Sequence, residues 1–240
     1  MDYYRDSEDG QAQADLNRLM DGTFSNQEAG MPEGTVHSEL LRRPGKLYVL
    51  ASHFHPDHFN KEVLQWREQR PDIIYIFSKD ILRHRRAQKE DAVWLKKGEE
   101  YKDETLSVRA FGSTDVGVSF LLQASGKKIF HAGDLNNWHW MDESTEAQWK
   151  GAEKNFLHEL DDLYAYTPEV DVAMFPVDPR LGKEYMRGAG QFVTKIKTHI
   201  FVPMHFTPEY AKANAFRDFA EAHGVRFVSL THRGQKIEIE

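Results

Sequence analysis

Three histidines and one aspartate lie within six residues of the sequence, in the segment His53-Phe54-His55-Pro56-Asp57-His58. Imidazole nitrogens suit zinc and other first-row metals, and a carboxylate is a harder ligand that also accepts manganese or iron. A single loop histidine is more often a solvated side chain, but four donor residues at this spacing indicate a metal site. The chain has no cysteine, so such a site must be built from histidine, aspartate and glutamate.

The segment follows the apolar run Leu47–Ala51, which predicts a buried strand. The donor residues therefore stand at the carboxyl end of a strand, where α/β sheets usually carry their sites. The proline after His55 favours an extended conformation there, and residues two apart in an extended chain point the same way. We therefore expect His53 and His55 to share one ion. Asp57 and His58 follow as the chain turns, and they are expected to reach a second ion.

Three further predicted strands end in polar residues of a similar kind: Lys128–His131 before Gly133-Asp134, Ile200–Pro203 before His205, and Leu106–Phe111 before Ser113 and Asp115. Taken singly, Asp134 is explained as a cap, His205 as a core histidine, and the residues of the third turn as turn formers. Four strand ends with this chemistry together predict one site assembled from several strands.

These residues, in this order, resemble the metallo-β-lactamase-fold hydrolase superfamily over residues 45–240. Residues 53–58 match its H-x-H-x-D-H signature in full, Asp134 matches the aspartate that bridges two metals, and His205 matches the final histidine. Within the superfamily the chain looks most like the ascorbate-6-phosphate-lactonase-like branch of lactonases and phosphodiesterases. The fold implied is an α/β, αββα sandwich: two mixed β-sheets face to face, with helices on the outer faces.

The resemblance implies two metal positions, the first with His53 and His55, the second with Asp57, His58 and His205, and Asp134 bridging both. The cofactor is expected to be one or two divalent transition metal ions, zinc first and manganese or iron as alternatives. Metal-bound hydroxide would attack a small ester, lactone or phosphoester. Asp57 would also orient the attacking water or accept its proton. The alternatives are a nuclease of the same superfamily and a metal-binding scaffold without turnover.

Two features depart from the family pattern. The family usually has a histidine where this chain has Ser113, and serine is a poor zinc ligand, so the first metal position is expected to be the weaker one. Asp115, His139 or water is left to complete it. The segment Met1–Tyr4 looks like the end of the strand hairpin with which the family begins, as if that hairpin were missing, which would expose a sheet edge.

The segment after Asp134, which runs Leu135-Asn136-Asn137-Trp138-His139-Trp140, is a candidate wall of a substrate pocket. Ordinary packing of its tryptophans is an equal alternative. His139 is interpreted as either a substitute ligand or a substrate contact.

The chain is expected to form one domain over residues 1–240, with a loop-rich segment over residues 1–45 that holds a short helix near Ala12–Met20. The pattern predicts strands and helices in alternation from Leu47 to Gln88 and an antiparallel meander over residues 93–132. The later elements expected are helices over Thr145–Tyr166, Glu184–Ile196 and Tyr210–Ala222, and strands over Val170–Phe175, Val225–Leu230 and Lys236–Glu240.

The net charge of −7 argues against broad electrostatic binding to nucleic acid and favours a small-molecule substrate. No apolar run approaches the length of a membrane span, and the N-terminus lacks an apolar signal core. A cytoplasmic protein without a membrane partner is therefore expected. The sequence contains no feature that indicates an oligomeric state.

Overall fold

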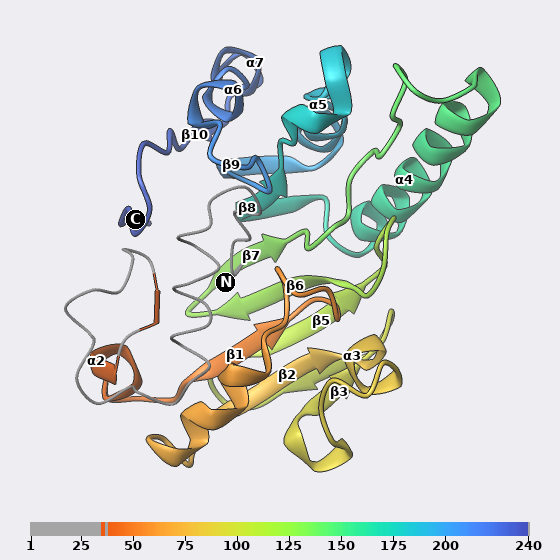
Figure 1. The fold of residues 1–240 in the computed structure, drawn as a ribbon. Helices are drawn as coiled ribbons and strands as arrows, with labels where there is room; N and C mark the ends of the chain where they lie inside the picture. Colours follow the sequence, from red (N-terminus) through yellow and green to blue (C-terminus); the bar gives the residue numbers. More distant parts are fainter. Residues whose placement is uncertain (1–34, 37, 240) are drawn as a thin grey trace.

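The computed structural model describes residues 35, 36 and 38–239, and Figure 1 shows how they are arranged. The helix expected near Ala12–Met20 and the segment Met1–Tyr4, interpreted as the remnant of a hairpin, lie outside the described residues. Among the described helices, none is both long enough and apolar enough to cross a membrane.

The smaller of two sheets holds the strand that precedes the histidine segment. Within the described residues it has three parallel strands in the order β1-β2-β3: β1 Tyr48–Ala51, β2 Ile74–Ser78 and β3 Val93–Leu95. Successive residues of β2 face opposite sides, as the period of a strand requires. Ile76 packs with Phe120 of the larger sheet, whereas Tyr75 and Phe77 pack with Trp66 on the helical side.

The larger sheet is mixed. In the described part of the chain its seven strands lie in the order β10-β9-β8-β7-β6-β5-β4, with bounds β4 Glu100–Lys102, β5 Ser107–Phe111, β6 Ser119–Ala124, β7 Lys127–His131, β8 Glu169–Pro176, β9 Lys197–Met204 and β10 Arg226–Phe227. Strands β4 to β7 are antiparallel neighbours, and β7 to β10 are parallel. Because β7 and β9 run the same way, the residues that follow them lie at one edge of the sheet.

Helical segments lie on the outer faces of both sheets (Figure 1). The α-helices are α2 Ser38–Leu41, α3 Lys79–Arg83, α4 Glu146–Tyr166, α5 Arg187–Lys195, α6 Tyr210–Asn214 and α7 Arg217–Ala222. The 3-10 helices of the described residues are η2 Lys61–Glu68, η3 Lys89–Asp91 and η4 Pro179–Glu184. The side chain of Thr145 accepts from Gln148 N and the side chain of Gln148 reaches back, so a capping box starts α4 where the sequence predicts it.

Three of the four apolar clusters among the described residues separate the four layers. Phe156 and Leu160 of α4 pack with Phe130 and Phe175 of the larger sheet. A second core lies between the sheets, and a third lies between the smaller sheet and the helices η2 and α3. Each sheet is thus apolar on both faces, which is the packing of an αββα sandwich. The expected fold class is confirmed.

The pairing of the strands differs from the expected meander. Strand β3 pairs with β2, so the antiparallel meander covers only β4 to β7. The last strand expected, Lys236–Glu240, is not a strand over residues 236–239; Ile237 packs instead against the cluster that contains Val172 and Ile200. Apolar alternation shows that a segment has two faces, but its strand partner is set by long-range packing.

Two expected helices are shorter than their apolar patterns. The sequence predicts a helix over Lys79–Gln88, within the alternating segment, but α3 ends at Arg83, and Arg85 takes a left-handed conformation with φ of 55°. The helix expected over Tyr210–Ala222 divides into α6 and α7. At that division Phe216 is fully buried, with its ring 5.0 Å from the ring of Phe201, so tertiary packing overrides helical continuity.

Candidate metal centre

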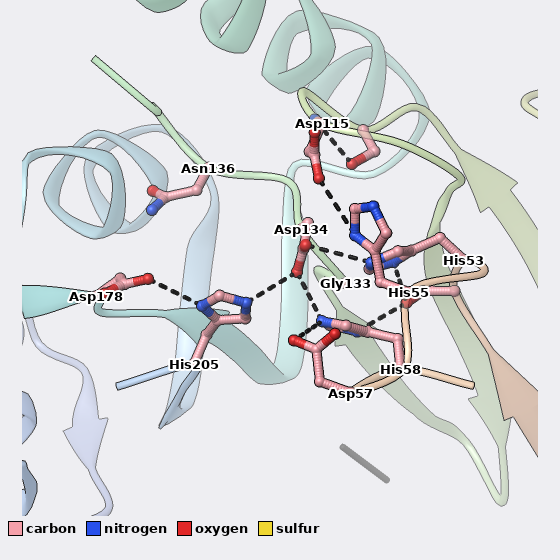
Figure 2. Close-up of polar contacts among 12 residues, drawn as sticks. His53, His55, Asp57, His58, Asp115, Gly133, Asp134, Asn136, Asp178 and His205 are labelled. Atoms are coloured by element: carbon pink, nitrogen blue, oxygen red, sulfur yellow. Dashed lines mark hydrogen bonds and ion pairs between the residues drawn. The ribbon is translucent and has the colours of Figure 1, made fainter. Parts of the chain in front are cut away.

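Seven residues with potential ligand side chains meet at one edge of the sandwich (Figure 2). Four follow β1, and one each follows β5, β7 and β9: His53, His55, Asp57, His58, Asp115, Asp134 and His205. They form two groups whose donor atoms lie within 4.8 Å of one another, one with His53, His55, Asp115 and Asp134 and the other with Asp57, His58 and His205. The structure therefore brings together all six residues proposed as ligands from the sequence, and it adds Asp115.

Two glycines allow the loops to approach β1 this closely. Gly117 has φ of 74°, and a Cβ there would lie 2.1 Å from the carbonyl oxygen of Ser52. Gly133 has φ of 54°, and a Cβ there would lie 2.9 Å from Ser52 Cβ. The backbone N–H of Val118 donates to the same Ser52 carbonyl at 3.0 Å. The loop after β5 and the turn after β7 thus pack directly on Ser52, which positions their acidic residues beside the histidine segment.

Asp134 lies at the centre of the site (Figure 2). Its Oδ1 is 3.1 Å from His58 Nε2 and 3.3 Å from His205 Nε2, and its Oδ2 is 3.3 Å from His53 Nε2. Burial opposes ionisation, but the contacts from His53 and His58 and the charges of His58 and His205 outweigh it and hold the pKa of Asp134 well below its usual range. The carboxylate is therefore ionised at neutral pH.

The spacing of the donors fits shared metal ions. Two donors that bind one ion at about 2.1 Å, at tetrahedral or octahedral angles, lie about 3.0–3.5 Å apart. The aspartate–histidine separations in the site run from 3.1 to 3.6 Å. Among the described residues, neither His53 Nε2 nor Asp134 Oδ1 has a hydrogen-bond partner of suitable geometry, although both atoms are buried. Bonds to a metal would satisfy these atoms, and imidazole with carboxylate is a donor set that transition metals accept.

Asp115, and not Ser113, reaches the group that contains His55. Asp115 Oδ2 lies 3.6 Å from His55 Nδ1, whereas the Ser113 hydroxyl accepts from the backbone N–H of Asp115 at 3.4 Å. His139, the other substitute considered, is buried with both ring nitrogens engaged: Nε2 lies 3.1 Å from a carbonyl oxygen and Nδ1 accepts a backbone N–H at 3.1 Å. Its contacts fix the backbone locally, so His139 is not a substitute ligand.

Ser52 contacts two candidate ligands, His53 and His58, at the ring nitrogen that faces away from Asp134. The sequence alone did not reveal this role. The Oγ of Ser52 lies 3.1 Å from Nδ1 of His53 and 3.3 Å from Nδ1 of His58, and the residue is buried. The contact to Nδ1 leaves Nε2 of each ring directed at Asp134. Groups that hold the second nitrogen of a ligand histidine fix its tautomer and orientation. The only sequence signal was its place directly before the histidine segment.

Asp178 supports His205 in the same way. Asp178 follows the predicted strand Val170–Phe175, and the sequence leaves open a turn or a side chain that faces the pocket, with the turn favoured. In the structure its side chain accepts from Arg180 N at 3.0 Å at the start of η4. The same carboxylate also accepts from His205 Nδ1 at 3.0 Å, and it is fully buried. The guanidinium of Arg180 forms an ion pair with it. Asp178 therefore both forms the turn that the sequence favours and supports a candidate ligand.

His205 takes a left-handed backbone conformation with φ of 60°, which is uncommon for a residue with a side chain. Burial would lower the pKa of its imidazole, but the hydrogen bond to Asp178 and the charges of Asp134 and Asp178 outweigh burial and raise the pKa to about 8. With Nδ1 donating to Asp178, Nε2 is the nitrogen that faces Asp134. A metal would replace the proton on Nε2.

The segment after Asp134 lies against the site through Trp138. Its Nε1 donates to the Asp134 carbonyl at 2.8 Å, and its ring lies 5.5 Å from the ring of His205. Trp140 stacks on Trp138 with a ring separation of 6.4 Å. Trp138 therefore lies beside the candidate ligand His205 with Trp140 stacked on it, and a wall of a substrate pocket stays a prediction for this segment.

No family model and no curated protein sequence matches the chain. Solved structures do match it. Igni18, a metallo hydrolase from the archaeon Ignicoccus hospitalis, is 16% identical over 78% of this chain and 77% of its own, with a TM-score of 0.53. CmlA, a diiron β-hydroxylase from Streptomyces venezuelae, is 14% identical over 79% of this chain and 45% of its own, with a TM-score of 0.53. YhfI, a metallo-β-lactamase-fold protein from Bacillus subtilis, is 8% identical over 78% and 75%, with a TM-score of 0.51. At these identities the likeness establishes the fold alone, and the chain has the metallo-β-lactamase fold.

Proposed function

We propose that this chain is a metal-dependent hydrolase of a small ester, lactone or phosphoester. The observation that carries the proposal is the convergence of imidazole and carboxylate donors at separations of 3.1 to 3.6 Å, at the edge of a metallo-β-lactamase fold. Divalent transition metal, when bound there, supplies a Lewis acid and lowers the pKa of a water toward neutrality. Zinc, manganese and iron all suit such donors, in one or two copies.

The residues proposed as ligands form two positions that share Asp134. The first position has His53 and His55, and the second has Asp57, His58 and His205. Asp134 suits the shared role because its two oxygens face histidines of both positions. Its low pKa keeps both oxygens available as ligands at neutral pH.

Asp57 is the carboxylate proposed to take the proton of the attacking water. Its Oδ2 lies 3.5 Å from His58 Nε2, so it stands at the second position. Its side chain is 38% exposed, whereas those of His58 and Asp134 are 1% and 7% exposed. The buried residues therefore form the floor of the site, and Asp57 stands where a substrate and its water would enter. A carboxylate so placed can orient the water and accept its proton.

The expected substrate remains a small molecule. Trp138 and Trp140 offer aromatic surface next to His205, as small-molecule pockets usually do. The net charge of −7 weighs against a nucleic-acid substrate. We also propose, from the sequence, that the chain belongs to the ascorbate-6-phosphate-lactonase-like branch and that it is cytoplasmic.

Elemental analysis combined with a substrate panel tests the proposal. The purified protein, after incubation with zinc, manganese or iron and desalting, should hold at least one ion per chain and hydrolyse a member of a panel of esters, lactones and phosphodiesters. His58→Ala and His205→Ala should each lower metal content and turnover. His199→Ala is the matched control, because His199 lies on β9, the strand that His205 follows, but pairs with Glu169 at the surface.

Each other outcome has a definite meaning. A wild-type protein that takes up no metal would refute the hydrolase. Bound metal without turnover on any substrate would favour the non-catalytic scaffold, and turnover restricted to RNA would favour the nuclease.

A further inference from the structure

The resembled family has a histidine where this chain has Ser113. In the structure of this chain, the carboxylate that lies beside His55 is that of Asp115. Asp115 is one of four residues, with His53, His55 and Asp134, whose donor atoms cluster within 4.8 Å. Its Oδ2 points to His55 Nδ1 at 3.6 Å (Figure 2). This separation is close to the one that two ligands of a common ion have.

We propose that Asp115 completes the first metal position and that this exchange shifts the position from zinc toward manganese and iron. The inference depends on the metal centre proposed above, but not on the reaction that the centre performs. It assigns a ligand, and a metal preference, that the histidine of the resembled family would not give.

The geometry favours Asp115 over the other candidates. Its side chain is 46% exposed, and among the described residues it forms no ion pair with a lysine or arginine, so no cation competes for the carboxylate. His139 is excluded because its ring nitrogens contact Glu184 and Met141. Serine is a poor zinc ligand, and the hydroxyl of Ser113 accepts from the backbone N–H of Asp115 at 3.4 Å.

The donor sets of the two positions become equal with Asp115 in place. The first then has two imidazoles and two carboxylates, His53 and His55 with Asp115 and Asp134. The second has the same composition, His58 and His205 with Asp57 and Asp134. Three carboxylates therefore serve the two ions, where a histidine in place of Asp115 would leave two.

The metal preference follows from the chemistry of these donors. Imidazole suits zinc, whereas carboxylate oxygen suits manganese, and two histidines with carboxylate and open positions are typical of iron(II) sites. Affinity for a given site generally rises from manganese to zinc. The proposed shift is therefore a smaller gap between zinc and manganese affinity, rather than an absolute preference for manganese.

The test compares zinc and manganese affinities of the whole chain before and after Asp115 is replaced by histidine. Wild type, Asp115→His and Asp115→Asn are titrated with each metal, with bound manganese counted by electron paramagnetic resonance and zinc by elemental analysis. Glu221→His, on the exposed surface of α7, is the matched control for an added histidine. Loss of a residue that hydrogen-bonds to a metal ligand changes metal affinity about 10–100-fold. Exchange of a ligand itself should have at least a comparable effect, so Asp115→His should raise the ratio of zinc affinity to manganese affinity about tenfold or more.

Asp115→Asn removes the charge without adding a histidine, so it should lose the ion at the first position and keep the one held by His58 and His205. Melting of the metal-free proteins checks that each variant folds. The proposal is overturned if Asp115→His shows the same zinc-to-manganese ratio as wild type and Glu221→His, or if Asp115→Asn keeps both ions at unchanged affinity. Either result leaves the hydrolase proposal standing, provided that wild type binds metal and His58→Ala does not.

Discussion

Removal of the charge on Asp178 should weaken the second metal position without unfolding the protein. Asp178 Oδ2 accepts from His205 Nδ1 at 3.0 Å, and this contact turns Nε2 toward Asp134. His205 also holds a left-handed backbone conformation with φ of 60°, so its side chain depends on a fixed partner. Asp178→Asn keeps the shape and one acceptor oxygen but loses the negative charge that steadies a metal-bound imidazole.

The magnitude follows from what each substitution leaves in place. Loss of a group that supports a ligand histidine typically weakens metal affinity about 10–100-fold, which corresponds to about 1.4–2.8 kcal/mol. The amide oxygen that Asp178→Asn introduces would still accept from His205, so this variant should lie near the tenfold end. Asp178→Ala removes the acceptor as well and leaves the guanidinium of Arg180 beside His205 Nδ1, at 3.3 Å in the wild type, so it should lie near the hundredfold end.

The assay is a competition of the protein with a chelator for zinc, at a pH of about 8.5. The pH matters because the pKa of His205 is about 8 with Asp178 ionised, and it should fall toward the ordinary 6.5 without that charge. At neutral pH, the lower pKa of His205 in the variants means that fewer protons compete with zinc for Nε2. This gain in affinity would partly offset the affinity lost with the contact to Asp178. Asp171→Asn is the matched control, since Asp171 is on β8 and, among the residues that the structure describes, its carboxylate accepts a backbone N–H from Lys128 and does not contact a candidate ligand. Equal affinity in wild type, Asp178→Asn and Asp178→Ala would refute the role assigned to Asp178.

Three further predictions concern Glu62, Ser52 and Gly117. Burial raises the pKa of Glu62 to about 7, above its unfolded value of 4.5, so the protein should lose stability as pH rises through 7. In urea unfolding, Glu62→Gln should match wild type at pH 4 and be more stable than wild type by up to about 3 kcal/mol at pH 8. A stability difference that does not depend on pH would contradict this. Ser52→Ala removes the hydroxyl behind His53 and His58 and should lower zinc affinity about 10–100-fold in chelator competition, with unchanged melting of the metal-free protein. Gly117→Ala places a Cβ 2.1 Å from the Ser52 carbonyl oxygen at φ of 74°, so it should lower the free energy of unfolding in urea by more than about 1–2 kcal/mol and lower the metal content. Unchanged stability and unchanged metal content would show that the loop has room to move.

The sequence by itself determined the chemistry of the metal segment and much of the scaffold. Ligand type and spacing in residues 53–58, and the apolar run before them, depend only on neighbours along the chain, so local rules were sufficient. Helix α4 lies where its apolar periodicity predicts it, and β3 lies at the start of the block expected to form strands, although its partner differs. The order of Asp134 and His205 after the first motif gave the αββα fold through its resemblance to a known family.

Only the tertiary structure decided what stands beside each donor. The sequence left Asp115, His139 and water open and favoured His139, whereas the packing of the loops brings Asp115 to His55 and buries His139 against Glu184. The sequence favoured a turn at Asp178. In the structure, the parallel pairing of β8 with β9 also places Asp178 next to His205. These contacts join residues that are distant along the chain, and burial in a particular sheet order creates them. Local spacing can therefore provide the ligands, but the packing of the whole fold selects their partners.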